Sequence, residues 1–186
     1  MTRIRVQIPP GKSGDFEIAH FTDTTTRNMW QTYLEMKKES YGSYTVLLKE
    51  GCPMPIMQDS EAEYNEHAPL FENATGDVLI GGLGIGFCHQ KLIDNPDVTS
   101  VTIVEKYQEV VDLVWEHCPK DDRFSLVVAD IEEWEPSEGT SWDYAWFDTW
   151  LIDNLLDYKQ HRAFMEERYG EYVTTIGSWN SLPVGE

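Results

Sequence analysis

Three glycines at alternate positions are the residues of this chain whose spacing says most about chemistry. Gly82, Gly84 and Gly86 follow an apolar run of strand type, Val78–Ile80, and a helix can begin directly after them. A side chain at these positions would block a tight turn or keep a ligand away from the backbone. A nucleoside-containing cofactor commonly lies across such a turn, at the carboxyl end of the first strand of a doubly wound sheet. The glycines therefore predict a cofactor site.

An acidic residue follows each of the next three predicted strands: Glu105, Asp130 and Asp148. Because the carboxyl ends of parallel strands meet at one edge of a sheet, we expect these carboxylates in the same crevice. Glu105 lies 23 positions after Gly82, close to the spacing of about 20 at which dinucleotide folds place a ribose-binding acid. A carboxylate suits that role because it accepts hydrogen bonds from both ribose hydroxyls. For each of the three, a solvated acid is the competing interpretation.

The glycine spacing also separates two classes of cofactor. A dinucleotide turn has the pattern G-x-G-x-x-G or A. Counted from Gly82, its last position is Phe87, which is too large for close helix–strand packing. The alternate pattern is complete, and it resembles motif I of the class I S-adenosylmethionine-dependent methyltransferases. The resemblance covers about residues 77–150, and it implies a Rossmann-like fold that binds S-adenosylmethionine.

The resemblance implies a role for each of these residues. Glu105 matches the acid that binds the ribose, and Asp130 with Ile131 matches the position that contacts the adenine. The backbone of Gly82–Gly86 would hold the amino-acid end of the cofactor. Asp148 matches the acid near the reacting groups, where it would orient or deprotonate the acceptor. Catalysis would then consist mainly of positioning donor and acceptor.

The segment before the glycine strand resembles a second branch of the same fold, the spermidine synthases. Residues 61–66 read E-A-E-Y-N-E, similar to that branch's E-x-x-Y-H-E, and Gln58 lies upstream. The resemblance implies decarboxylated S-adenosylmethionine as cofactor, Gln58 and Tyr64 on the substrate side, and Asp148 as the general base for an amine.

Two motifs depart from that branch. Its turn reads G-G-G-D-G-G, whereas residues 81–86 read G-G-L-G-I-G, and of its D-S-x-D-P motif only Asp148 is present. The sequence W-F-D-T-W at residues 146–150 is similar instead to small phage-type proteins with a methyltransferase-like core. Trp146 and Trp150 predict either an aromatic wall for a cationic ligand or ordinary core packing.

Strand and helix patterns alternate from residue 77 onward, which predicts an α/β fold. We expect a doubly wound, mostly parallel sheet of about five strands, with helices on both faces. Residues 1–70 form a small β-containing section on the lid or substrate side, 71–180 the cofactor-binding domain, and 181–186 a tail. The predicted strands are 4–8, 16–21, 44–48, 78–80, 101–104, 124–129, 144–147 and 172–176; the predicted helices are 24–38, 61–70, 87–93, 108–117 and 152–168.

Composition limits the partners. Lys and Arg total 14 against 33 Asp and Glu, a formal charge of −19. This balance argues against nucleic acid and against an anionic membrane surface. We expect a small-molecule substrate, with a cationic amine among the candidates, and the sequence leaves open whether the protein forms a homo-oligomer.

The three cysteines have no paired spacing, and the chain begins with no apolar leader segment. We therefore expect a cytoplasmic protein, and one encoded by a phage and acting in the host cytoplasm is compatible with this. The histidines show no metal-ligand spacing, so no metal is expected.

The sequence leaves three functions open. The first is a methyltransferase-like protein that transfers a group from an adenosyl-sulfur cofactor to a small acceptor. The second is an aminopropyltransferase similar to spermidine synthase. The third is a protein that binds the cofactor without catalysis, suggested by the 38 residues that follow Asp148. A nicotinamide enzyme is a distant fourth.

Overall fold

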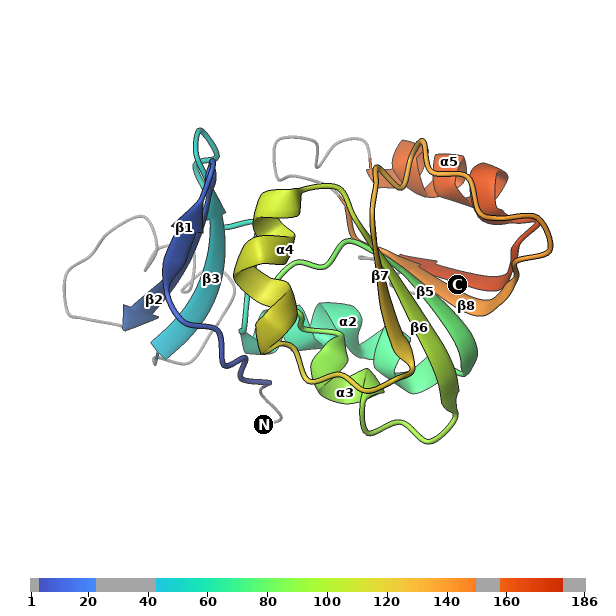
Figure 1. Ribbon diagram of the computed structural model, residues 1–186, viewed down its shortest axis with the longest axis horizontal. Helices are drawn as coiled ribbons and strands as arrows, with labels where there is room; N and C mark the ends of the chain where they lie inside the picture. The colour runs from blue at the N-terminus through green and yellow to red at the C-terminus, as the bar shows by residue number, and fades with distance from the viewer. Residues whose placement is uncertain (1–3, 23–42, 150–157, 179–186) are drawn as a thin grey trace, which may run out of the picture.

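The computed structural model describes residues 4–22, 43–149 and 158–178, which form two sheets (Figure 1). The first sheet is antiparallel and has the order β1-β2-β3-β4. Its strands are β1 (Gly11–Ser13), β2 (Phe16–Thr22), β3 (Ser43–Lys49) and β4 (Met57–Gln58). The helix predicted over 24–38 and the tail predicted over 181–186 lie outside the described residues.

The second sheet is parallel throughout and confirms the predicted α/β, Rossmann-like class. Its order is β7-β6-β5-β8-β9, so the chain leaves β5 to one side and later returns to its other side. The carboxyl end of β5 is therefore a topological switch point, where open α/β sheets bind ligands. The strands are β5 (Gly76–Gly81), β6 (Val98–Glu105), β7 (Phe124–Val128), β8 (Trp142–Phe147) and β9 (Val173–Ser178).

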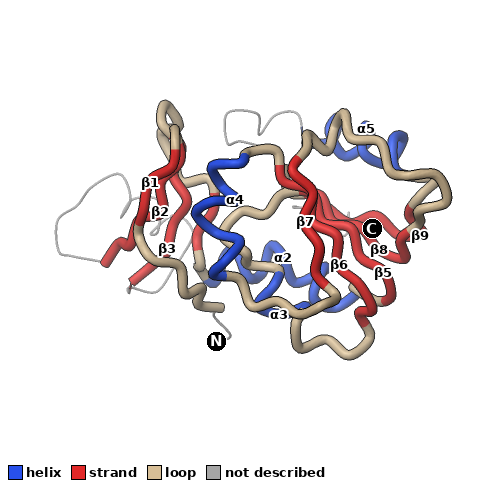
Figure 2. Tube along the Cα trace, viewed as in Figure 1, coloured by secondary structure: helices blue, strands red, loops and turns tan. Residues whose placement is uncertain are grey.

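Helices cover both faces of the parallel sheet. They are α2 (Glu61–Asn73), α3 (His89–Leu92), α4 (Gln108–Val114), which continues as a 3₁₀ turn over Trp115–His117, and α5 (Tyr158–Tyr169). Figure 1 shows α5 on one side of the sheet and α2 and α3 on the other. In Figure 2, α4 lies between the two sheets, where it contacts β1, β2 and β6. None of the described helices is long and apolar enough to cross a membrane.

The two faces of the sheet have separate cores, as the period of two along a strand requires. On β5, Val78 and Ile80 face the core that α2, α3, α4 and the N-terminal sheet complete. Leu79 faces the other core, which includes Met165 of α5. One face of the N-terminal sheet therefore packs into the first core. The boundary predicted between residues 70 and 71 falls inside α2.

The prediction of a strand over residues 4–8 is wrong. Ile4, Val6 and Ile8 are buried in the first core while the residues between them are exposed, but this segment has no place in either sheet. Alternating burial indicates an extended chain that buries one side. Such a chain does not need a hydrogen-bonded neighbouring strand. The predicted helix 87–93 is also shorter in the structure, where α3 spans four residues.

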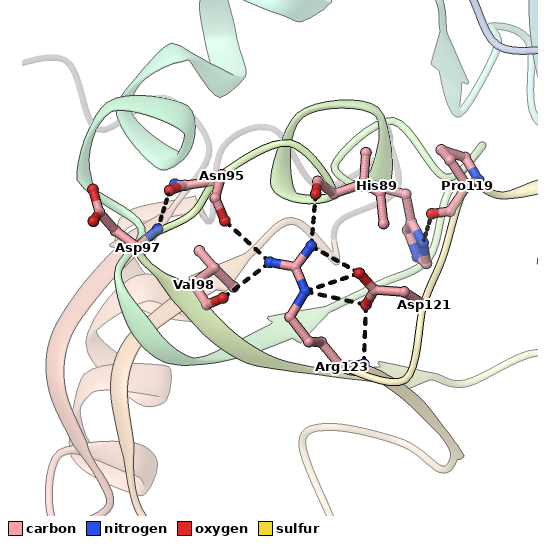
Figure 3. Close-up of polar contacts among 8 residues, drawn as sticks. His89, Asn95, Asp97, Val98, Pro119, Asp121 and Arg123 are labelled. Atoms are coloured by element: carbon pink, nitrogen blue, oxygen red, sulfur yellow. Dashed lines mark hydrogen bonds and ion pairs between the residues drawn. The ribbon is translucent and has the colours of Figure 1, made fainter.

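The Arg123 side chain forms hydrogen bonds with the loop at the amino end of β6 (Figure 3). These contacts lie at the opposite end of the strands from the glycine turn. Its guanidinium donates to the carbonyl oxygens of Asn95 and Val98 at 3.0 Å and of Ile93 at 2.6 Å. Its Nε also donates to Asp121. One side chain thus ties the start of β7 to the loop between α3 and β6.

His89 packs in the same region, with its Nδ1 3.2 Å from the Pro119 carbonyl oxygen (Figure 3). Its ring stacks on Phe124 with centroids 4.8 Å apart, and its edge meets Trp115. Burial lowers the pKa of His89 to about 4, because a charged imidazolium would lose its hydration there. The folded protein therefore holds this ring neutral.

We predict that His89 makes the fold less stable as pH falls. Its folded pKa lies below the unfolded value of about 6.5, so below that pH the unfolded chain binds a proton that the folded chain excludes. Between about pH 7 and about pH 5 this linkage should lower the free energy of unfolding by about 2 kcal/mol. Urea unfolding at both pH values should show that His89→Phe removes this loss.

The control for this measurement is His117→Gln, because His117 is exposed. It should keep the wild-type difference between the two pH values. An equal pH dependence in wild type and His89→Phe would contradict the prediction.

Candidate functional site

The glycine turn after β5 has a backbone that only glycine adopts easily. Gly82 has a φ of +95° and Gly84 a φ of +54°, in the region that disfavours side chains. A β-carbon at Gly82 would also lie 2.8 Å from the Asp148 carbonyl oxygen, and one at Gly84 2.4 Å from Met57 Sδ. The turn is thus pressed between the end of β8 and β4, with no room for side chains.

The Glu105 carboxylate fixes this turn to the end of β6. Its Oε2 accepts a hydrogen bond from the Leu83 N–H and its Oε1 one from the Tyr107 N–H, both at 2.8 Å. The side chain is 6% exposed. Burial raises the pKa of Glu105, and the backbone N–H groups around it lower that pKa in part. One of these hydrogen bonds comes from the turn and the other from the residue before α4, so the carboxylate is held from both sides.

A cavity of about 640 Å³ lies between this edge of the parallel sheet and the N-terminal sheet. Six of the predicted site residues line it, which the structure gathers from the ends of four strands: Gly82, Gly84, Glu105, Asp130, Ile131 and Asp148. The opposite wall includes Phe16 of β2, Leu47 of β3 and Met57 of β4.

Of the other predicted residues, the three that the structure describes do not line this cavity. A β-carbon at Gly86 would meet Cys118 Sγ below the turn. Gln58 is buried and donates to Ser60 Oγ at 3.1 Å, and the Tyr64 ring packs on Phe71. Trp150 lies outside the described residues.

The aromatic wall is not formed by Trp146. Its side chain is fully buried in the first core and its ring lies 5.6 Å from that of His67. This follows from its place on β8, a strand with neighbours on both sides and helices over both faces. The core-packing interpretation of Trp146 is therefore correct.

Asp130 pairs with a cation that the sequence did not single out. Lys106 Nζ lies 2.5 Å from Asp130 Oδ2, and the Glu132 N–H donates to Asp130 Oδ1. Burial alone would raise the pKa of Asp130, but these two donors outweigh it and the pKa is lowered. Lys106 directly follows Glu105 in the sequence, so its side chain reaches the same edge of the sheet.

Beneath Asp148 lies His67, the second residue that sequence analysis missed. Asp148 N–H donates to the Gly81 carbonyl oxygen, and Asp148 Oδ2 lies 3.2 Å from His67 Nε2. His67 is fully buried. Burial alone would lower the pKa of His67, but Asp148 and the Cys88 thiol raise it well above its usual range. The available signal was its position four residues after Glu63, which puts both on one face of α2.

A second histidine reaches the cavity from α5. His161 Nε2 lies 3.1 Å from Thr149 Oγ1 and 3.1 Å from Glu132 Oε1. Burial lowers the pKa of His161, and Glu132 opposes that shift. This contact joins α5 to the loops after β7 and β8, beside Asp148.

Comparisons with known proteins concern the fold only. No protein-family model matches the chain, and no curated sequence is similar to it. Among solved structures it is similar to spermidine synthase from Thermotoga maritima (18% identity, TM-score 0.49), covering 78% of this chain and 49% of that one. It is also similar to a dimethyladenosine transferase from Plasmodium falciparum (14% identity, TM-score 0.33), covering 46% of this chain and 31% of that one. Since one fold hosts many functions, the function has to come from the site's own residues.

We predict that the close packing of the glycine turn can be measured by one substitution. Gly84→Ala should lower the free energy of unfolding by about 2–4 kcal/mol, because it adds a clash with Met57 to the cost of a positive φ. Gly51→Ala is the matched control, since Gly51 has a φ of +82° and a β-carbon added there would meet no atom within 4 Å. It should lose only about 1 kcal/mol. Equal losses in urea unfolding would show that Met57 does not press on the turn.

Proposed function

We propose that this protein binds an adenosyl-sulfur cofactor, S-adenosylmethionine or its decarboxylated form, and transfers a group from it to a small acceptor. One observation carries the proposal. The cavity at the switch point of the parallel sheet gathers the glycine turn, Glu105 and Asp130, which the family resemblance assigns to such a cofactor, and Asp148, which it assigns to the acceptor.

The residues present fit a cofactor of this kind. Gly82 and Gly84 leave a strip of backbone without side chains along the cavity, which a β-carbon at either position would disturb. The cavity volume of about 640 Å³ lies within the range of about 300–1,000 Å³ for small-molecule sites. The wall is part apolar, from Phe16, Leu47 and Ile131, and part acidic, which suits a ligand with a flat base and a polar sugar.

The proposed roles follow from position along the edge. Glu105, held in place by two backbone N–H groups, would accept from the ribose hydroxyls. Asp130 would accept from the adenine amine beside the Ile131 side chain, and the turn backbone would hold the amino-acid end. When bound, the cofactor supplies an electrophilic carbon next to a cationic sulfur. Asp148 would orient the acceptor towards it, so that positioning supplies most of the acceleration.

An aminopropyl transfer to a polyamine is the second candidate, and the charge of the cavity favours it. Glu105, Asp130, Glu132 and Asp148 all line the cavity, and of the described basic residues Lys106 and His161 line it with them. A cationic amine would be attracted to such a lining. Binding without catalysis is the third candidate, and it makes no use of Asp148.

We predict that calorimetric titration distinguishes adenosyl-sulfur ligands from NAD. S-adenosylmethionine, its decarboxylated form or S-adenosylhomocysteine should release heat with one site per chain, and NAD should not. Preference for the decarboxylated form, with turnover of putrescine, would favour the second candidate. Tight binding without turnover on a panel of acceptors would favour the third. Absence of heat with all three adenosyl-sulfur ligands would overturn the proposal.

We also predict that Glu105→Ala weakens binding of S-adenosylhomocysteine by about 1.5–3 kcal/mol, the range for hydrogen bonds to a charged group. Glu105→Gln should lose less, because its amide keeps one acceptor oxygen. Glu116→Ala removes the same charge from an exposed position on the turn after α4, and it should bind as the wild type does. Circular dichroism of each variant checks that the fold is retained. An unchanged affinity for Glu105→Ala would show that Glu105 does not hold the ribose.

A further inference from the structure

Glu63, His67 and Asp148 bring a nitrogen and two carboxylates together, and of these residues Asp148 lines the cavity. One ligand atom from each lies within 4.8 Å of the others. Glu63 and His67 are four residues apart on α2, whose position is fixed by the Ser60 N-cap, and Asp148 comes from the end of β8. The three residues are therefore held by two elements that pack in the same core.

The hydrogen bond at Nδ1 decides which His67 nitrogen can bind a ligand. Nδ1 lies 2.9 Å from the Glu63 carbonyl oxygen and 3.5 Å from Glu63 Oε1, so the Glu63 carboxylate must turn from Nδ1 towards Nε2 to share an ion with Asp148. A carbonyl oxygen only accepts, so Nδ1 carries the proton and the lone pair of the neutral ring is on Nε2. Histidines that bind metals commonly have this arrangement, with the second ring nitrogen donating to a backbone carbonyl or a carboxylate.

Nε2 is buried and faces the Asp148 carboxylate without a proper hydrogen bond. It lies 3.2 Å from Asp148 Oδ2, yet among the residues that the structure describes it has no hydrogen-bond partner of acceptable geometry. A lone pair and a carboxylate oxygen repel each other unless positive charge lies beside both. Without a metal, a second ring proton supplies that charge: burial alone would lower the pKa of His67, but Asp148 and the Cys88 thiol raise it. A metal ion bound here would take the place of that proton. Two ligand atoms each about 2.0–2.2 Å from one cation are separated by about 3–3.5 Å, depending on the angle between them, and this contact lies in that range.

From this geometry we infer that Glu63, His67 and Asp148 bind a divalent transition-metal ion of the Zn²⁺ or Mn²⁺ type. One imidazole nitrogen with two carboxylates suits these ions better than Ca²⁺ or Mg²⁺, which prefer oxygen ligands alone. Three protein ligands leave a coordination position open. Of the three, Asp148 lines the cavity, so the proposed ion would lie next to it. The site needs no adenosyl ligand, so its test is independent of the function proposed above.

The first test is titration of the metal-free protein with Co²⁺ and with Zn²⁺, at mildly alkaline pH where the ligands lose their protons. We expect one tight site per chain by calorimetry and a visible Co²⁺ absorption that Zn²⁺ abolishes. Glu63→Gln and Asp148→Asn, which keep side-chain shape, should each weaken binding at least about tenfold. The control is Glu72→Gln, an exposed carboxylate on the same helix, which should bind as the wild type does.

A second measurement uses only the wild-type chain, so it does not depend on the folding of a variant. The sequence has five histidines, and ¹⁵N-imidazole NMR with Zn²⁺ should shift one Nε2 resonance in the pattern of a metal-bound nitrogen. His67→Gln should remove that signal. Weak binding unaffected by Glu63→Gln, or a His67 ring that stays doubly protonated and unchanged by Zn²⁺, would overturn the inference and assign a proton to the contact with Asp148.

Discussion

The hydrogen bonds of the buried Glu105 carboxylate are the constraint on which the rest of the site depends. They join the Leu83 N–H in the glycine turn to the Tyr107 N–H at the start of α4, and the Gly82 N–H adds a bond to Val104 beside them. A buried carboxylate without such donors would cost several kcal/mol. Because the buried carboxylate needs these donors, it holds the turn in one conformation. In that conformation the turn backbone faces the cavity.

The N-terminal sheet and α2 complete the site from the other side. Met57 of β4 fills the space beside Gly84, and its sulfur lies 3.4 Å from the Ile85 N–H. α2 carries His67 beneath Asp148. Met57 and the α2 residue Leu70 belong to the core that also covers the parallel sheet, so one core supports both the cavity wall and the scaffold. Lys106 and His67 each lie against an acid of the cavity, so its excess negative charge is partly balanced.

The sequence alone determined the parallel half of the fold and the edge of the sheet at which the three acids gather. Strand period, the alternate glycines and an acid after each strand are local properties, and right-handed crossovers bring strand ends together without any knowledge of side-chain packing. Glu105, Asp130 and Asp148 were found for this reason, and the structure places all three on one cavity. The prediction of a strand over residues 4–8 was wrong because burial on one side of an extended segment is also a local property. It does not require a neighbouring strand.

Only the tertiary structure decided what faces these acids. Met57, His67 and His161 come from elements whose positions depend on how helices and the N-terminal sheet pack, and no spacing in the sequence encodes that packing. The same packing buries the Trp146 side chain in the core and keeps Tyr64 and Gly86 out of the cavity lining. The sequence could therefore place the groups that one sheet edge collects, whereas the partner of Asp148 was set by contacts between distant segments.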